Sequence, residues 1–384
     1  MEPLEDALSV PFAATAMLRF VGVILQSVTP LLVVDALGRP AALAGFYMTI
    51  FWVAVGAGAI AAVTLVRDLR TSGTVGFSLT FVSLLGFAAA VRLPYLLPAF
   101  FVMSGAGAGM VQPVLAPAMH AAAPSGRPYR GVGYYSTALS LGLISGTSVA
   151  SATVGLAGFS PVFLGAAAGA MLLLLRMRRW GAGGKAGMPS WRAFRETVRK
   201  AGFGRSYGLG VFYSSLLPVV LSYSGIYAES AYGMTSSQVL LLLAAVFTLS
   251  LAVRLGSLRV RAGHFGRALV FPVLVLVASF LLMGFSGSAS LFVLGMLLFS
   301  VPHALLYPWT LFNALQAAGK DNALAAGYAF ATSSGVGEFL APSMAAFVIA
   351  FYGLRLLFPV MTAVALLALV WALAFFVRDV GLPA

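Results

Sequence analysis

The sequence consists of long apolar runs separated by short gaps. A helix rises about 1.5 Å per residue, so about 20 apolar residues are enough to cross the hydrocarbon core of a bilayer. Twelve such runs occur, at residues 7–34, 41–66, 71–91, 94–119, 131–155, 157–177, 205–228, 236–256, 267–286, 288–315, 323–350 and 353–377. The pattern predicts an all-α integral membrane protein with twelve transmembrane helices.

The composition excludes most other classes of protein. Of the 384 residues, 61% are hydrophobic and 9% are charged, whereas a soluble domain has roughly 25% charged residues. A soluble enzyme, a nucleic-acid-binding domain and a disordered chain are therefore excluded. The sequence has no cysteine, so disulfides and thiolate metal sites are excluded too. The N-terminal residues MEPLEDALSV are acidic where a secretory signal is basic, so we keep the first run as a span.

The basic residues predict the orientation in the membrane. With the N-terminus placed in the cytoplasm, Arg39, Arg92 and Arg355 lie on the outer side and Arg19 lies inside a span. The other 19 of the 23 basic residues fall on the cytoplasmic side, as the positive-inside rule requires. The sequence therefore predicts a multi-pass protein of the cell membrane with both termini in the cytoplasm. The net charge of +13 is thus explained by basic residues that orient the chain in the membrane, and it does not indicate nucleic-acid binding.

One long connection divides the runs into two sets of six. We expect an N-terminal six-helix bundle at 1–178, a cytoplasmic linker at 179–204 and a C-terminal six-helix bundle at 205–384. The linker segment SWRAFRETVRK has the pattern of a basic amphipathic helix. Its Trp191, Phe194 and Val198 are spaced to meet lipid headgroups.

A weak repeat relates the two sets of runs. Pro113 and Pro308 are each followed about 20 residues later by a Gly-Tyr pair, at 133–134 and 327–328. Parallel repeats of this kind build many secondary transporters, with the substrate site between the halves near the bilayer midplane. The fold class is therefore two pseudo-symmetric six-helix bundles.

Along its whole length the sequence resembles the major facilitator superfamily. The resemblance in the fourth and fifth runs is carried by Gly105, Gly107, Gly109, Pro113, Arg130, Gly131, Gly142 and Gly146. The family's loop signature, G-x-L-x-D-R-x-G-R, is similar to GSLRVRAGH, where Gly256, Leu258, Arg261 and Gly263 match and Val260 replaces the Asp. A remnant follows the second run as Arg67, Asp68 and Arg70. The resemblance implies alternating access and assigns these loop residues to gating.

Three ionisable residues lie deep inside the apolar runs. Inserting a charged side chain at the centre of a membrane helix costs about 2.5–3.5 kcal/mol of free energy, so each of these residues is expected to have a structural or functional role. Arg19, His303 and Glu338 lie about 12, 15 and 15 residues into their runs, roughly 18–23 Å from an end. We expect Arg19 to attract an anionic group of the substrate, or to exchange partners with Glu338 during transport. Glu338 is the candidate proton carrier, and His303 is a candidate for substrate binding and proton coupling.

Each of these residues has a structural alternative. Arg19 could snorkel to the surface or form a permanent pair, Glu338 could hold helices together, and His303 could be a satisfied core residue. Five further polar residues are candidates for substrate binding. The family resemblance implies that the helices of Gln26 and Gln112 surround the cavity. Tyr213 and Tyr223 of the seventh run offer aromatic faces with hydroxyls, and Tyr307 shares a helix face with His303.

These features predict a secondary active transporter that moves a small organic solute by alternating access with proton coupling. An uncoupled facilitative uniporter and a non-transporting membrane receptor or scaffold on the same fold stay open as alternatives. The sequence contains no nucleotide-binding loop, catalytic triad or metal-ligand cluster, so we expect no enzyme activity, no cofactor and no metal. The expected partners are the solute, protons and membrane lipid, with no nucleic acid, and we expect a monomer.

Overall fold

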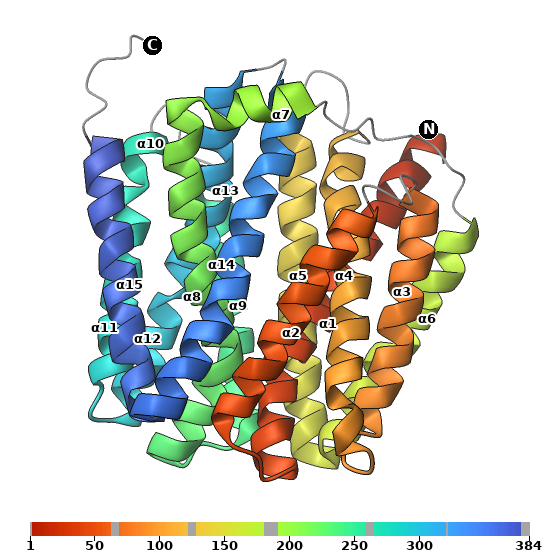
Figure 1. Ribbon diagram of the computed structural model, residues 1–384, viewed down its shortest axis with the longest axis vertical. Coiled ribbons are helices and arrows are strands. Elements are labelled where there is room, and N and C mark those ends of the chain that lie inside the picture. Colours follow the sequence, from red (N-terminus) through yellow and green to blue (C-terminus); the bar gives the residue numbers. More distant parts are fainter. Residues whose placement is uncertain are drawn as a thin grey trace. The chain divides into compact units, whose positions relative to one another are not determined.

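The computed structural model describes residues 2–62, 69–121, 128–179, 191–257, 265–319 and 322–377. All regular elements in these ranges are helices, which confirms the all-α class (Figure 1). Eleven segments within them are long and apolar enough to cross a membrane. The predicted ninth run, 267–286, is instead split, and its main helix Val270–Phe285 has 16 residues. The number twelve therefore stays a prediction.

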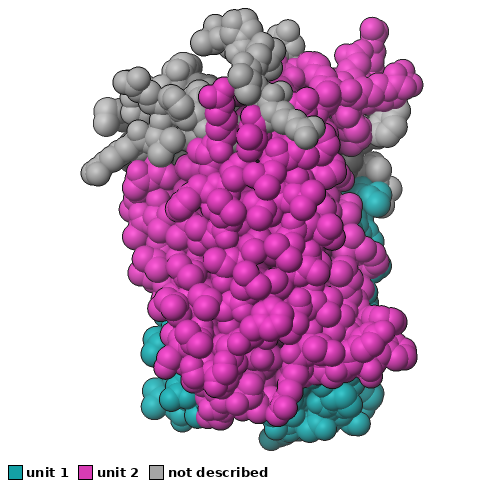
Figure 2. Space-filling view, turned by 90° about the vertical axis from the view of Figure 1, so that its left-hand side faces the viewer, with its two compact units in different colours: residues 1–188, 235–244 teal, residues 189–234, 245–384 magenta. Residues whose placement is uncertain are grey.

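The chain forms two compact units (Figure 2). Unit 1 contains residues 1–188 and 235–244, and unit 2 contains residues 189–234 and 245–384. Helix α9, Ser236–Ser257, thus has its first part in unit 1 and its remainder in unit 2. The predicted domain boundaries at 179–204 stay a prediction.

Unit 1 contains six long helices besides the start of α9. They are α1 (Glu2–Leu31), α2 (Ala41–Ala61), α3 (Leu69–Ala88), α4 (Leu97–Ala121), α5 (Pro128–Ala157) and α6 (Phe159–Arg179). Their main pairings are α1 with α5, α2 with α4, and α3 with both α4 and α6. Helix α1 also contacts α2 and α4, and these three helices surround the candidate site described below.

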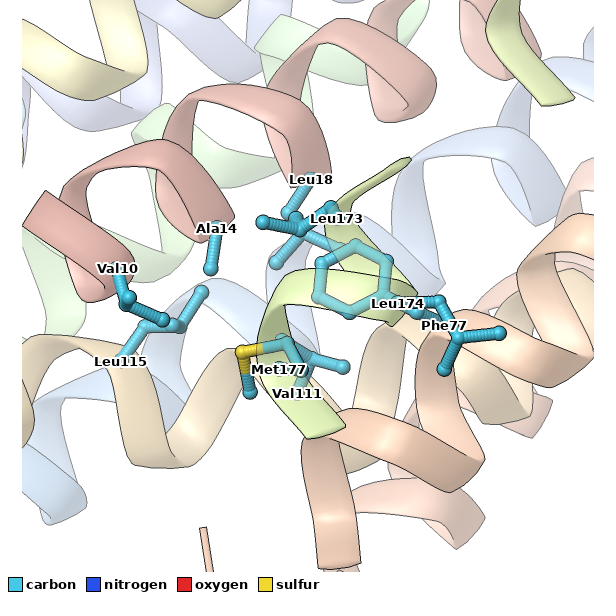
Figure 3. Close-up of a cluster of buried hydrophobic side chains, with 9 residues drawn as sticks. All are labelled: Val10, Ala14, Leu18, Phe77, Val111, Leu115, Leu173, Leu174 and Met177. Carbon is cyan, nitrogen blue, oxygen red and sulfur yellow. The ribbon is translucent and has the colours of Figure 1, made fainter. Parts of the chain in front are cut away.

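A buried apolar cluster joins four of these helices (Figure 3). Val10, Ala14 and Leu18 are spaced by four residues, which puts them on one face of α1. They pack with one residue of α3, two of α4 and three of α6, namely Phe77, Val111, Leu115, Leu173, Leu174 and Met177. Because lipid is as apolar as these side chains, close packing rather than escape from water stabilises such a contact.

Unit 2 contains the remaining helices. They are α7 (Trp191–Val198), α8 (Ala201–Tyr232), the later part of α9, α10 (Phe265–Ala268), α11 (Val270–Phe285), α12 (Ala289–Leu298), α13 (Ser300–Ala318), α14 (Ala323–Tyr352) and α15 (Leu357–Ala372). Helix α8 packs against α13 and α14, and α11 packs against α12 and α15. The pairing of α8 with α13 brings Tyr213 to His303, and Phe247 of α9 also contacts His303.

Within unit 2, the linker helix α7 lies against α8 and α14 (Figure 1). Its Phe194 packs on a buried cluster that includes Phe203 and Phe330, so this side chain faces protein rather than the lipid headgroups that the sequence suggested. Lys200, which follows α7, donates from Nζ to the carbonyl oxygen of Ala318 at the end of α13. The linker is therefore held to α13 at this point.

Candidate functional site

Unit 1 has a pocket between α1, α2 and α4. It has a volume of about 290 Å³, counting the space at its mouth, and it is lined by Leu18, Arg19, Gly22, Gln26, Phe51, Trp52, Val55, Ala108 and Gln112. Arg19 and Gln26 are seven residues apart, which places them on one face of α1. The structure thus brings together three of the predicted substrate-binding residues, Arg19, Gln26 and Gln112.

Glycines set the spacing of the helices around this pocket. A Cβ atom added to Gly109 of α4 would overlap the carbonyl oxygen of Val55 in α2, so the two backbones are in direct contact there. A Cβ atom at Gly142 of α5 would overlap the carbonyl oxygen of Ala16 and lie 2.8 Å from Cβ of Arg19. The glycines that carried the family resemblance therefore allow α4 and α5 to approach the helices that present the pocket residues.

Trp52 is a pocket residue that the sequence analysis missed. Its side chain is 5% exposed, and its indole Nε1 has no hydrogen-bond partner among the described residues. An indole N–H is a donor only, and a buried donor without an acceptor costs free energy. A tryptophan in the middle of an apolar run carries a polar N–H group into the membrane. This feature of the sequence could have identified Trp52 as a candidate.

In unit 2, Tyr213 and His303 form a buried pair. The hydroxyl of Tyr213 in α8 lies 2.6 Å from Nδ1 of His303 in α13. The rings of Phe247 and Phe299 flank the imidazole, with ring centroids 5.1 Å and 6.1 Å away. The imidazole is thus enclosed by aromatic rings and has a fixed hydrogen-bond partner at Nδ1.

Arg254, one of the basic residues that the sequence analysis assigned to the cytoplasmic side, contacts the same turn of α13. It lies inside α9 and donates from Nε to the carbonyl oxygen of Ala304 at 3.3 Å and from Nη2 to that of His303 at 3.4 Å. Pro308 has no N–H to give the carbonyl of Ala304, four residues earlier. The guanidinium supplies a donor to the carbonyl that the proline leaves without its helical partner, which is a physical reason for an arginine in the last turn of α9.

Glu338 is buried in α14, with 6% of its surface exposed. The preceding Gly337 lets α14 approach α8, since a Cβ atom there would lie 2.6 Å from the carbonyl oxygen of Val211. One turn earlier, Ser334 is buried and its hydroxyl has no hydrogen-bond partner in the described ranges. Glu338 lies in unit 2 and Arg19 in unit 1, so their exchange of partners stays a prediction.

The two other tyrosines of the prediction lie in different surroundings. Tyr223 has an exposed fraction of 0%, and its hydroxyl has no partner in the part of the chain that is described. Tyr307 is half-buried and packs on Phe330, with ring centroids 5.7 Å apart. Neither residue lines the pocket of unit 1.

The predicted gating residues are described only in part. Arg67, Asp68, Arg261 and Gly263 lie outside the described residues. Arg70 and Gly256 were expected in loops, but they belong to the first turn of α3 and the last turn of α9. The helices extend over these residues because both side chains are compatible with helical backbone hydrogen bonds, so the signature pattern did not mark the helix ends. Among the described residues, no three His, Cys, Asp or Glu side chains form a group that could hold a metal ion.

Comparisons with known proteins agree with this fold. A family model of the Major Facilitator Superfamily matches residues 12–334. A peptide-bound POT family transporter superposes with a TM-score of 0.76 at 14% identity, covering 97% of this chain and 96% of the other. The human organic anion transporter MFSD10 superposes with a TM-score of 0.66 at 18% identity, covering 96% of this chain and 99% of the other. The fucose:proton symporter FucP of E. coli superposes with a TM-score of 0.62 at 15% identity, covering 97% of this chain and 98% of the other.

No curated protein matches the chain. The helical architecture and these neighbours define a polytopic membrane protein with a transporter fold. Because the family model covers most of the sequence, the chain belongs to the major facilitator superfamily.

Proposed function

We propose that this protein is a secondary active transporter that moves a small organic solute across the cell membrane by alternating access. The observation that carries the proposal is the pocket of unit 1, where Arg19, Gln26 and Gln112 line one recess inside apolar spans. Polar groups at such depth are costly unless they serve a solvated path or a ligand. A receptor or scaffold would have no need of an open recess at this depth.

Proton coupling is the second part of the proposal. Glu338 is a buried carboxyl group inside a membrane span, where taking up a proton removes a costly charge. His303, held by Tyr213, is a second group on the proton path. One fold neighbour is described as a proton symporter, which supports the same class of energy source.

The membrane arrangement completes the proposal. We propose twelve helices in two six-helix halves, with Val270–Phe285 as the short ninth span. An even number of spans leaves both termini on one side of the membrane, which we propose is the cytoplasm. The excess of basic residues on that side supports this orientation. We expect the transporter to work as a monomer surrounded by lipid.

The test is transport by Glu338→Gln in liposomes. A thermal-shift panel of sugars, organic acids and amino acids in detergent first selects the solute that stabilises the protein most. With one proton per solute, a gradient of one pH unit supports up to about tenfold accumulation. We expect Glu338→Gln to lose this accumulation and to keep solute exchange between two equal pools, because the glutamine cannot carry a proton.

The control for this test is Glu229→Gln, which changes a half-buried carboxyl near the end of α8. This control variant should accumulate solute as the unmodified protein does. If Glu338→Gln kept its full response to the pH gradient, another residue would carry the proton. Exchange that ignores pH in the unmodified protein would favour a uniporter, and absence of transport would favour a receptor or scaffold.

A further inference from the structure

We propose that the exposed face of helix α7 binds the phosphate groups of anionic phospholipids at the surface of the bilayer. This face carries Arg192, Arg195 and Arg199, and all three side chains are exposed. It shares no residue with the pocket of unit 1. Lipid binding here is therefore a property of the protein beyond the proposed function, and it holds whether or not a solute is transported.

Helix α7 lies at the level where membrane spans begin and end. The span of α8 begins at Ala201, just after α7. Lys200 donates from Nζ to the carbonyl oxygen of Ala318, the last residue of the span that contains α13. Phe194 packs on a cluster that includes Phe330, in the first part of α14. Figure 1 shows α7 lying across the ends of these helices rather than along them. An amphipathic helix in this position lies at the boundary between hydrocarbon and water.

One side of α7 faces protein and the other side is exposed. Thr197 has an exposed fraction of 0%, and Phe194, three residues earlier, packs on the buried cluster. Arg192, Arg195 and Arg199 are spaced by three and four residues, so they form a row along the other side. The backbone N–H of Arg199 donates to the carbonyl oxygen of Arg195 at 3.3 Å, so Arg199 continues the last turn. The row of arginines, rather than Phe194, therefore faces the headgroups.

The exposed row has an excess of positive charge. Arg192 donates from Nε to Oε1 of Glu196 at 2.9 Å, and these two charges compensate each other. The charges of Arg195 and Arg199 remain. A guanidinium is protonated at any physiological pH and binds phosphate through parallel hydrogen bonds. Phosphatidylglycerol has a net negative charge and phosphatidylcholine has none, so this face should select the first lipid over the second.

The first experiment places a fluorescent probe beside the arginines. Val198 is exposed and the chain has no cysteine, so Val198→Cys carries a single probe. The labelled full-length protein is reconstituted in phosphatidylcholine nanodiscs that contain spin-labelled phosphatidylglycerol or spin-labelled phosphatidylcholine. A spin-labelled lipid quenches the probe on contact, so the two quenching levels give the lipid preference beside α7.

We expect the probe at position 198 to report a preference of about fivefold or more for phosphatidylglycerol, since each basic residue near an anionic surface contributes about fivefold to binding. Added salt screens charges at an exposed surface, so the preference should fall as the salt concentration is raised.

The second experiment changes the charges of the row. The double variant Arg195→Gln with Arg199→Gln should abolish the preference, because it removes the two charges that Glu196 does not balance. Glu196→Gln should have the opposite effect and raise the preference up to about fivefold, because it leaves the charge of Arg192 uncompensated. A loss and a gain from neighbouring exposed positions are not both expected from damage to the fold.

The controls separate this face from a general effect of charge. The double variant Arg92→Gln with Arg355→Gln also removes two exposed arginines, and it should keep the preference at the probe on position 198. A probe on Leu156→Cys should report no preference for phosphatidylglycerol. Leu156 is 89% exposed at the end of α5, and its neighbours in the sequence are uncharged.

The melting temperature of each variant shows whether it is folded. The proposal is overturned if the unmodified face shows no preference for phosphatidylglycerol, an outcome that would favour an acidic protein as the occupant. It is also overturned if the Arg195 and Arg199 double variant keeps the preference, or if the control double variant loses it equally. Soluble glycerol phosphate should compete only weakly, because it has no acyl chains. Full competition by this compound would contradict binding to a lipid surface.

Discussion

At the scale of single residues, Arg254 shows how a proline and an arginine can depend on each other. Pro308 has no N–H, so the carbonyl oxygen of Ala304 lacks its helical donor in α13. The guanidinium of Arg254 in α9 donates to this oxygen instead. The same turn of α13 carries His303, which bonds to Tyr213. Arg254 therefore stabilises the turn of α13 that carries His303, through the backbone carbonyl oxygens of His303 and Ala304.

Replacing this arginine tests its role. Arg254→Met leaves the carbonyl of Ala304 without this donor in an apolar region, so we expect the free energy of unfolding to fall by about 1–3 kcal/mol. Arg254→Lys can still donate and should recover part of the loss. Thermal unfolding in detergent measures both.

The comparison variant is Arg176→Lys, whose arginine bonds at 3.1 Å to the hydroxyl of Ser9 at an exposed position. It should change stability little, because exposed polar contacts contribute little. Equal melting temperatures for Arg254→Met and the unmodified protein would contradict the role assigned to Arg254.

The candidate site was predictable where a polar residue interrupts an apolar run. Arg19 stands out in this way, whereas Gln26 and Gln112 were singled out through the family resemblance, and the structure places all three in one pocket. Trp52 did not stand out, because a tryptophan counts as apolar even though its N–H needs an acceptor. The contact of Arg254 with Ala304 joins residues 50 positions apart, and no local pattern in the sequence reveals such a pair.

At the scale of helices, the existence of the elements was easier to predict than their ends. The apolar run at 205–228 corresponds to α8, which extends over Ala201–Tyr232. Polar residues end the run, but the backbone hydrogen bonds continue until Gly233, whose φ of 65° ends the helix. The break at Leu269 that separates α10 from α11 was not predicted, since the hydropathy does not change there.

Gly109 provides a test of how closely α2 and α4 pack. Gly109→Ala would place a methyl group against the carbonyl oxygen of Val55, and rigid backbone cannot move aside as a flexible side chain can. We expect a loss of about 1–3 kcal/mol in the free energy of unfolding, the usual cost of overpacking. The melting temperature in detergent measures it.

The matched substitution is Gly165→Ala in α6, where an added Cβ atom would meet no atom within 4 Å. Since glycine is less favourable than alanine inside a helix, this variant should be as stable as the unmodified protein or slightly more stable. If both variants melted at the same temperature, the close contact of α2 and α4 would not require glycine.

At the scale of the whole molecule, the uneven distribution of basic residues makes a prediction about topology. Arg92 and Arg355 are exposed at ends of helices and are assigned to the outer side, whereas the exposed Arg192 and Arg267 are assigned to the cytoplasm. Each of these positions tolerates a change of side chain more readily than a buried one.

Because the sequence has no cysteine, one introduced cysteine is a unique label. Arg92→Cys and Arg355→Cys should react with a membrane-impermeant maleimide in intact cells. Arg192→Cys and Arg267→Cys should react only after the membrane is permeabilised. Labelling of all four in intact cells, or the opposite pattern, would refute the predicted orientation.

The direct backbone contact of α2 with α4 also restricts how this protein can acquire a new cargo. With no side chain between Gly109 and the carbonyl oxygen of Val55, the two backbones are in contact beside the recess that the helices share. In the proposed transporter, a change of selectivity is then expected from exchanging side chains that line the recess, above all Phe51, Trp52 and Ala108. New solutes would then be accommodated by substituting lining side chains while the backbone contact of α2 with α4 is kept.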